Sequence, residues 1–283
     1  MDVRSLTDKR VLVTGAASGI GRATALAFAQ RGADVVICDV NESGLQETAG
    51  EIERLGRRAF ARRVDVSVRH EMREFAAWVH STIGVLDILV NNAGVGLGAT
   101  FLETPLEDWD WIVAINLMGV IHGCHFFIPP MVQRGAGGHV VNVSSAAGYV
   151  ASPPLAAYSA TKFAVLGLSE ALRQELEPHG IGVTAVCPGI INTPITRSAR
   201  LRGAAADERA REQMVRFYER RNYGPERVAE NILRAIQRNR AVAPISPEAW
   251  VFYYLKRWSP WLVYRLNRWL GRRAAGAAAT AAK

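Results

Sequence analysis

The sequence contains few cysteines, and their placement excludes two classes of small, cross-linked protein. The chain of 283 residues has three, Cys38, Cys124 and Cys187. They are odd in number and far apart, so they predict neither a disulfide framework nor a zinc-binding pattern. The chain is therefore expected to work in a reducing, cytoplasmic setting.

Targeting and membrane-spanning patterns are also missing. The first fifteen residues carry Asp2 and Asp8 and have neither the apolar run nor the small-residue cleavage site of a signal peptide. No uninterrupted apolar stretch reaches the length of about 18 residues that a membrane-spanning helix needs. We therefore expect no helix that crosses a bilayer.

Acidic residues are absent from the last part of the sequence. The net charge is +8, and residues 250–283 contain seven lysines and arginines with no aspartate or glutamate. The basic character thus belongs mainly to this end of the chain. A nucleic-acid-binding protein would carry a basic face on its folded domain together with a recognition motif. The sequence predicts neither, so we expect no nucleic acid among the partners.

Short β-rich runs alternate with helical segments over most of the chain, whose hydrophobic fraction of 49% is that of a globular protein. Strands are predicted at 10–14, 34–39, 58–66, 86–91, 139–144, 182–187 and 241–245. Helices are predicted at 20–30, 68–82, 107–133, 158–178 and 225–238. This alternation predicts an α/β fold, Rossmann-like and doubly wound, with a seven-stranded parallel sheet and helices on both faces.

No internal repeat or linker divides the region that contains these elements. We therefore predict a single dinucleotide-binding and catalytic domain over residues 1–246. An aromatic and basic helical extension is predicted at 247–273. The alanine-rich residues 274–283 are expected to be disordered.

Residues 156–165, AAYSATKFAV, place a tyrosine and a lysine four residues apart. This spacing puts Tyr158 and Lys162 on one helical face, within reach of each other. A phenol with a pKa near ~10 is a poor acid or base at neutral pH, but a neighbouring ammonium group favours the phenolate. The pair is thus a candidate acid/base. The same spacing also fits an ordinary amphipathic helix in which the tyrosine packs and the lysine reaches solvent.

A glycine-rich turn follows the first predicted strand. Gly15, Gly19 and Gly21 in TGAASGIGRA allow a tight turn and let a pyrophosphate approach the free N–H groups at a helix N-terminus. Asp39 ends the second strand about 20 residues later, where a carboxylate can bind an adenosine ribose and repel a 2′-phosphate. A strand-end aspartate that starts a turn with Asn41 is the alternative interpretation.

These motifs together resemble the short-chain dehydrogenase/reductase family from about Lys9 to Ile245. Its T-G-x-x-x-G-x-G turn is matched by Thr14 to Gly21, and its N-N-A-G by Asn91 to Gly94. The family also has a helix asparagine, a serine thirteen residues before the tyrosine of Y-x-x-x-K, and a P-G-x-x-x-T segment. The matching residues here are Asn116, Ser145, Tyr158, Lys162, Pro188, Gly189 and Thr193.

The resemblance implies NAD as cofactor and assigns two sets of residues. The catalytic set is Asn116, Ser145, Tyr158 and Lys162. The cofactor-binding set is Gly15, Ser18, Gly19, Ile20, Gly21, Asp39, Asp65, Val66, Asn92, Ala93, Gly94, Tyr158, Lys162, Pro188, Gly189, Ile191 and Thr193. Ser144 competes with Ser145, but it lies one residue too far from the tyrosine. For Asp65 a turn-forming role is the alternative.

The implied chemistry is hydride transfer between a nicotinamide and an alcohol or carbonyl carbon. Tyr158 would exchange the hydroxyl proton while Ser145 hydrogen-bonds the same oxygen. Lys162 would lower the pKa of Tyr158 and bind the nicotinamide ribose, and Asn116 would hold a water that links the lysine to solvent. Histidines and Cys124 in the HGCH segment, 122–125, have no carboxylate nearby, so packing is expected there rather than a metal site.

The expected substrate is a hydrophobic secondary alcohol, ketone or aldehyde, such as a steroid, a retinoid or a lipid-derived molecule. The alternative is a catalytically idle NAD-binding interaction or membrane-peripheral protein on the same fold. A homodimer or homotetramer is expected. Residues 247–273 combine tryptophans and leucines with arginines, which is typical of an interfacial membrane helix. Packing on a partner subunit or over the substrate pocket is the competing interpretation.

Overall fold

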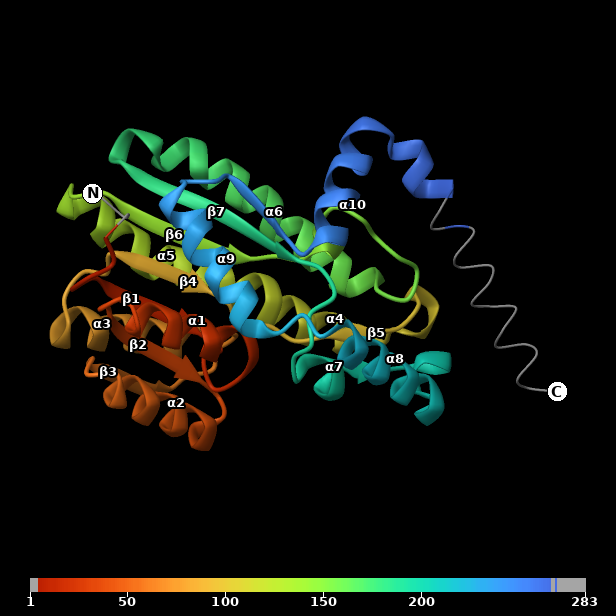
Figure 1. Ribbon diagram of the computed structural model, residues 1–283, viewed down its shortest axis with the longest axis horizontal. Helices are drawn as coiled ribbons and strands as arrows, with labels where there is room; N and C mark the ends of the chain where they lie inside the picture. Colours follow the sequence, from red (N-terminus) through yellow and green to blue (C-terminus); the bar gives the residue numbers. More distant parts are fainter. Residues whose placement is uncertain (1–4, 266–267, 269–283) are drawn as a thin grey trace.

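The computed structural model describes residues 5–265 and 268. Its centre is a parallel sheet in the order β3-β2-β1-β4-β6-β7-β9 (Figure 1). The strands are β1 (Arg10–Thr14), β2 (Asp34–Asp39), β3 (Ala59–Arg63), β4 (Ile88–Asn91), β6 (Gly138–Val143), β7 (Ile181–Pro188) and β9 (Val242–Ile245). The predicted doubly wound, seven-stranded fold is confirmed, and the strand bounds differ by a few residues at most.

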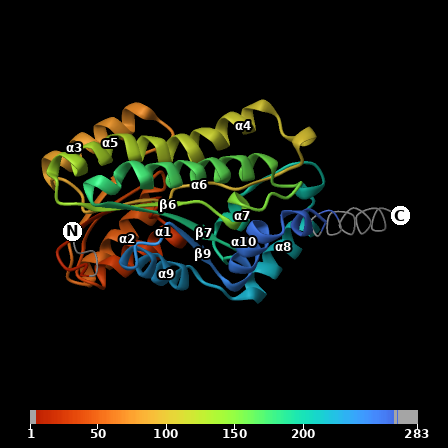
Figure 2. The ribbon, with the colours of Figure 1, turned by 90° about the horizontal axis from the view of Figure 1, so that it is seen from above.

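Helices cover both faces of this sheet (Figure 2). One face carries α1 (Gly19–Ala29), α2 (Glu42–Arg54) and α9 (Pro225–Gln237), and the other carries α3 (Arg69–Thr82), α5 (Gly119–Arg134) and α6 (Ala156–Leu176). Alternate strand residues point to opposite faces. Val11 and Val13 therefore join the first helical layer, while Leu12 between them joins the second.

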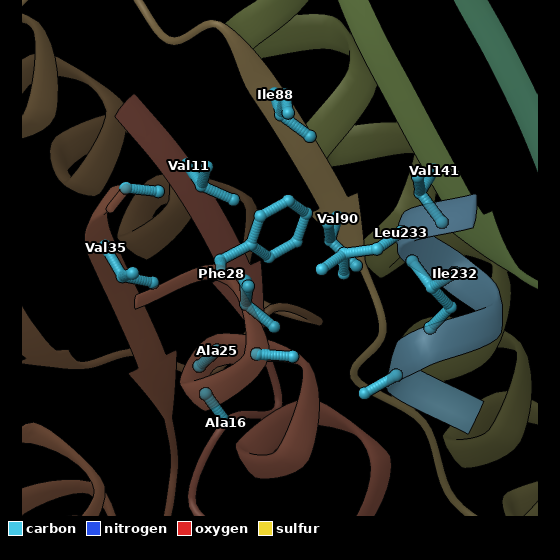
Figure 3. Packing of buried hydrophobic residues seen from close by; sticks show 14 of the residues in the cluster. Val11, Ala16, Ala25, Phe28, Val35, Ile88, Val90, Val141, Ile232 and Leu233 are labelled. Carbon is cyan, nitrogen blue, oxygen red and sulfur yellow. The ribbon is translucent and has the colours of Figure 1, made fainter. Parts of the chain in front are cut away.

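Phe28 of α1 lies at the centre of the first layer, among β1, β4 and α9 (Figure 3). Its side chain is fully buried, and Leu233 of α9 is a neighbour in the same cluster. Contacts between residues so far apart in the chain join the first βαβ unit to the last helix of the sheet.

Helix α2 was not predicted. Its side chains at Leu45, Ala49 and Ile52 are buried at helical spacing, and Asn41 caps its start by accepting a hydrogen bond from the Gly44 N–H at 3.3 Å. The periodic signal was therefore present in the sequence. Polar and charged residues fill most of the remaining positions of this segment and face solvent, which made that signal weak.

The predicted helix at 107–133 consists of three parts. These are α4 (Leu106–Val113), a π-helical turn at Ala114–Met118, and α5. By length and composition the whole segment Leu106–Arg134 could cross a membrane, contrary to the sequence expectation, but half of its apolar window is buried inside the protein. Buried Asp108 and Asn116 lie within it. We therefore interpret it as a core helix.

The segments beyond the carboxyl ends of the strands form a smaller unit. It contains a two-stranded sheet of β5 (Leu97–Gly98) and β8 (Arg200–Leu201), with α7 (Ile195–Ser198) and α8 (Glu208–Arg221) beside it. Buried Asp108 accepts hydrogen bonds from Arg200 at 2.9 Å and Arg202 at 2.7 Å. The hydrogen bond from Arg202 has the largest effect on the pKa of Asp108. Together with the Arg200 pair it holds this pKa below its usual range, although burial acts in the opposite direction.

The C-terminal extension begins with α10 (Pro247–Trp258), directly after β9. Helical backbone continues from Pro260 to Arg265. The predictions for residues 266–267 and 269–283, including the apolar positions Leu266, Trp269 and Leu270, lie outside the described residues. Division of the chain at residue 246 therefore stays a prediction, although α10 packs closely on the preceding elements, as described below.

Replacing the central aromatic of the first layer should test this packing. We expect Phe28→Ala to lower the free energy of unfolding by about 3–5 kcal/mol, because it removes a fully buried ring and leaves a cavity. Leu102→Ala is the control, because Leu102 is 94% exposed and should cost at most about 0.5 kcal/mol. Denaturant unfolding measures both, and a loss below about 1 kcal/mol for Phe28→Ala would contradict the assignment.

Candidate active site

The glycine turn joins β1 to α1 at the middle of the sheet, where the strand order reverses between β1 and β4. Gly15 has φ +67°, and a Cβ there would lie 2.7 Å from the Cα of Ala93. A Cβ on Gly21 would lie 2.0 Å from the carbonyl oxygen of Gly15. Both positions therefore require glycine.

The N-terminus of α1 has the properties of an anion site. Among the described contacts, the Ser18 side chain makes no capping hydrogen bond, and the first turn of α1 carries no acidic residue. Gly19, with φ +54°, has the side chain of Thr193 as a neighbour 3.6 Å from where its Cβ would lie. The free N–H groups and the absent Cβ fit a pyrophosphate at this turn, beside Ile20 and Thr193.

The side chain of Asp39 is hydrogen-bonded to the backbone of the same turn. Its carboxylate accepts hydrogen bonds from the Ala17 N–H at 3.0 Å and from the Asn41 N–H at 2.9 Å. Asp39 thus starts the Asn41 turn and places its charge beside the glycines, whereas its binding to an adenosine ribose stays a prediction. Arg63 of β3 is its register neighbour, a basic side chain that the sequence reasoning did not consider.

The side chain of Asp65 stabilises the turn in which the residue lies. Its carboxylate accepts hydrogen bonds from the N–H and hydroxyl of Ser67, at 2.9 and 2.6 Å. Val66 is buried, and its carbonyl is 2.9 Å from Nδ1 of His122. Asp65 therefore has the turn-forming role that the sequence offered as the alternative. A contact of Asp65 or Val66 with the adenine of a cofactor stays a prediction.

The segment after β4 connects the glycine turn to the candidate catalytic residues. Asn92 donates from its amide to the carbonyls of Thr14 and Gly15, at 2.8 and 3.1 Å. The backbone N–H groups of Asn92 and Ala93 both donate to the Thr14 hydroxyl at 3.0 Å. A Cβ on Gly94 would lie 3.2 Å from Oδ1 of Asn116, so this glycine lets the two segments approach.

Asn116 is fully buried in the π-helical turn between α4 and α5. Its amide is satisfied by Val95, whose N–H donates to Oδ1 at 2.8 Å and whose carbonyl accepts from Nδ2 at 2.9 Å. Nδ2 also lies 3.4 Å from the Thr161 hydroxyl of α6. Local π-helical geometry is frequent at functional sites, and here it directs the asparagine inward between two layers.

The two neighbouring serines have different surroundings. Ser144 is buried and its hydroxyl donates to the backbone carbonyl of Lys162 at 2.7 Å. Ser145 accepts from the Ala147 N–H at 3.1 Å, its hydroxyl donates to the Pro188 carbonyl at 3.5 Å, and it is near enough to Tyr158 to lower the pKa of that phenol. Ser144 thus supports the helix, whereas Ser145 is the serine beside the tyrosine.

Tyr158 and Lys162 lie together on the first turns of α6. The Lys162 ammonium is 5.7 Å from the centre of the Tyr158 ring and donates to the Val143 carbonyl at 2.9 Å. Burial raises the pKa of Tyr158 to about 12, although the Ser145 hydrogen bond acts in the opposite direction. Burial lowers the pKa of Lys162 to about 8.

In the protein without ligands, Lys162 therefore does not offset the effect of burial on the pKa of Tyr158. Desolvation of the phenolate outweighs a nearby charge. The lysine also directs its ammonium to a carbonyl, as described above, rather than to the phenol oxygen.

The P-G-x-x-x-T segment after β7 lies beside the glycine turn. Ile191 packs in the core and Thr193 is almost fully buried near Gly19. A Cβ on Gly189, which follows Pro188, would lie 2.4 Å from the Ser246 hydroxyl oxygen and 2.9 Å from Oε1 of Glu248. The segment is thus enclosed by the glycine turn on one side and the start of α10 on the other.

Glu248 is a residue that the sequence reasoning missed. One oxygen of its carboxylate accepts from the Ile190 N–H at 3.0 Å, and the other is paired with Arg221 at the end of α8. Ala249 is fully buried and its carbonyl accepts from the Tyr149 hydroxyl at 2.7 Å. A glutamate in the first turn of a helix is common, so the sequence held no signal of this long-range role.

Over the described part of the chain, no group of three or more histidine, cysteine or acidic side chains could hold a metal ion. Within the HGCH segment, Cys124 is buried beside Asn142, 3.7 Å from its Oδ1. His122 and Cys124 pack in the core, whereas His125 is exposed.

Comparison with known proteins identifies the family. The family model described as short chain dehydrogenase matches residues 9–203. The chain belongs to the short-chain dehydrogenase family. It is 43% identical over 257 residues to the "Probable oxidoreductase EphD" of Mycobacterium tuberculosis, covering 89% of this chain and 43% of that protein. The chain therefore spans less than half the length of this relative.

Two solved short-chain dehydrogenase structures differ in their cofactors. The enzyme from Burkholderia phymatum in complex with NAD has a TM-score of 0.80 and 31% identity, over 89% of this chain and 94% of that one. The alcohol dehydrogenase of Thermococcus sibiricus, complexed with 5-hydroxy-NADP, has a TM-score of 0.69 and 25% identity, over 81% and 90%. Membership in the family thus establishes an oxidoreductase fold without choosing between NAD and NADP.

The link between Glu248 and Arg221 should restrain α8. Glu248→Gln keeps an acceptor for the Ile190 N–H but removes the ion pair, so we expect trypsin to cleave the arginine-rich α8 several times faster. Glu212→Gln is the control, because it breaks an exposed pair with Arg216 within the same helix and should change little. Limited proteolysis measures these rates. Cleavage of Glu248→Gln at the same rate as the parent protein would show that Glu248 does not restrain α8.

Proposed function

We propose that this protein is an NAD(H)-dependent oxidoreductase acting on the CH–OH group of a hydrophobic secondary alcohol, or on the corresponding ketone or aldehyde. The observation that carries the proposal is the cluster of Ser145, Tyr158 and Lys162 beside the glycine turn. When bound, the nicotinamide would supply or accept the hydride. Gly15, Ser18, Asp39 and the other cofactor-binding positions named above would hold it.

In the reducing direction, Tyr158 acts as the acid. A pKa of about 12 keeps its phenol protonated throughout the neutral range, and Ser145 hydrogen-bonds the same substrate oxygen. In the oxidising direction the phenolate must form. Lowering the pKa from about 12 to neutrality requires about 7 kcal/mol of additional phenolate stabilisation, which the ammonium of Lys162 supplies in part once ligands reorganise the site.

Lys162 would then return the proton toward solvent through Asn116. The approach of Lys162 and Asn116 to Gly94, whose Cβ would lie 3.5 Å from Nζ and 3.2 Å from Oδ1, supports this arrangement.

The proposed substrate class follows from the side chains around the tyrosine. Tyr158 packs against a cluster built from Leu97, Ile112 and Ala157, with Trp109 and Trp111 at its edge. An apolar cluster around the catalytic tyrosine favours a lipophilic alcohol or ketone, such as a steroid, a retinoid or a lipid-derived molecule.

We further propose that the protein works in the cytoplasm as a homodimer or homotetramer. The three cysteines are free and buried, which suits a reducing compartment.

Tyr158→Phe tests the acid/base role and distinguishes the enzyme from an idle NAD-binding protein. We expect turnover to fall at least about 100-fold, while the dissociation constant for NADH changes little, because only a hydroxyl is lost. Absorbance of the reduced nicotinamide, followed over a panel of lipophilic alcohols and ketones, measures turnover, and fluorescence titration measures binding. Retention of more than a tenth of the activity would refute the role.

Asp39→Asn tests the cofactor choice. The amide keeps an oxygen acceptor for the Ala17 N–H but removes the charge that repels a 2′-phosphate. We expect the parent protein to have a higher kcat/KM with NAD than with NADP. In the variant the ratio of the two kcat/KM values should be smaller. The control is Val40→Ala, at an exposed and uncharged neighbour. Comparable kcat/KM for both cofactors in the parent would show that a base such as Arg63 reaches the phosphate.

A further inference from the structure

Helix α10 exposes an apolar stripe to solvent. Val251, Tyr254, Leu255 and Trp258 follow the i, i+3, i+4, i+7 spacing of a single helical face. This face is usually the one that packs on a protein core. Here Val251 is 62% exposed, Tyr254 53% and Trp258 85%. Three large side chains on one exposed face need a partner that no described residue provides.

The helical segment after Ser259 also exposes large side chains. Trp261, Leu262 and Tyr264 are exposed, whereas Val263 between them is buried. We call the exposed set the C-terminal aromatic surface, and its members are Val251, Tyr254, Trp258, Trp261, Leu262 and Tyr264.

The body of the protein fixes the direction of this surface. Ala249 on the opposite side of α10 is fully buried, and the Tyr149 ring is 5.5 Å from that of Tyr253. The buried side of α10 is therefore anchored, and the aromatic side is held outward.

The segment that carries the C-terminal aromatic surface is basic. It contains Lys256, Arg257 and Arg265, and residues 250–283 contain no acid. The Arg265 guanidinium stacks on Trp261, 4.8 Å from the ring centre, and that of Arg257 on Tyr253 at 4.6 Å. Arg257 also approaches Glu170 at 3.6 Å. Bases beside exposed tryptophans complement an anionic surface that has an apolar interior.

We propose that the C-terminal aromatic surface docks on the face of an anionic lipid bilayer. Tryptophan and tyrosine rings are suited to the boundary between headgroups and acyl chains, and each base near the surface adds attraction to anionic lipid. A second copy of this chain fits less well. A symmetric dimer places the same patch on both sides of its interface, so the bases of both copies would meet.

The position of this surface relates it to the site. Helix α10 starts at the carboxyl end of β9, and its Tyr253 packs on Tyr149 in the loop that follows Ser145. Figure 1 shows α10 and α8 at the same end of the molecule, away from α3. The lipid contact would lie on the helix that packs on the loop after Ser145, but docking does not depend on the proposed activity.

The test uses the full chain with vesicles of phosphatidylcholine alone or with about one third phosphatidylserine. We expect co-sedimentation with the anionic vesicles, weaker binding to the neutral ones, and loss of binding as salt screens the attraction. Tryptophan fluorescence should shift to shorter wavelength on binding. NADH binding, measured in the same samples, reports that the fold is intact.

Two variants separate the apolar and the electrostatic parts. Trp258→Ser should lower the vesicle partition coefficient about tenfold, whereas Leu102→Ser, at a more exposed leucine outside the surface, should not. Removing two bases with Lys256→Gln and Arg265→Gln should lower it about 30-fold. Arg69→Gln with Arg73→Gln makes the same charge change on α3, outside the C-terminal aromatic surface, and should have a small effect.

Several outcomes would overturn the proposal. Absence of vesicle binding, equal binding to neutral and anionic vesicles, or equal losses in the α3 control would each do so. If instead Trp258→Ser lowers the mass measured by light scattering and vesicles do not bind, the surface is an interface between copies of this chain. Failure of vesicle binding with normal turnover would leave the proposed activity intact.

Discussion

Four hydrogen bonds between the end of β1 and the start of the segment after β4 hold the centre of this molecule together. The Thr14 hydroxyl accepts from the N–H groups of Asn92 and Ala93, and the Asn92 amide donates to the carbonyls of Thr14 and Gly15. They fix the glycine turn against its neighbour at the point where the strand order reverses. Because Gly94 comes next in the chain, the same bonds place it against Asn116 and Lys162.

The chemical properties of the site follow from that close packing. A tyrosine and a lysine buried together both shift toward their neutral forms, since neither can be hydrated. The unliganded site is therefore set for proton donation rather than abstraction. Ser144, Val143 and Val95 hold the reacting residues in place through hydrogen bonds that involve the backbone.

Patterns that are local in the chain could be predicted, and contacts between distant segments could not. The glycines, the seven strands and the Tyr158–Lys162 spacing follow from rules that operate within a few residues. The π-helical turn at Asn116, the Glu248 bridge and the pairing of β5 with β8 depend on segments that meet only in the fold. The same is true of the tyrosine pKa, because burial is a property of the fold. Helix α2 is different, since its spacing was readable but its surface is mostly polar.

The backbone at Ser246, between β9 and α10, is strained. Its φ of +97° belongs to a region that side chains other than glycine rarely occupy, and its buried hydroxyl has no hydrogen-bond partner in the described chain. Such a joint stores conformational energy between the Gly189 loop and the start of α10. If a ligand at the glycine turn and a partner at α10 both bind best to the same conformation of this joint, each strengthens the binding of the other by the same factor.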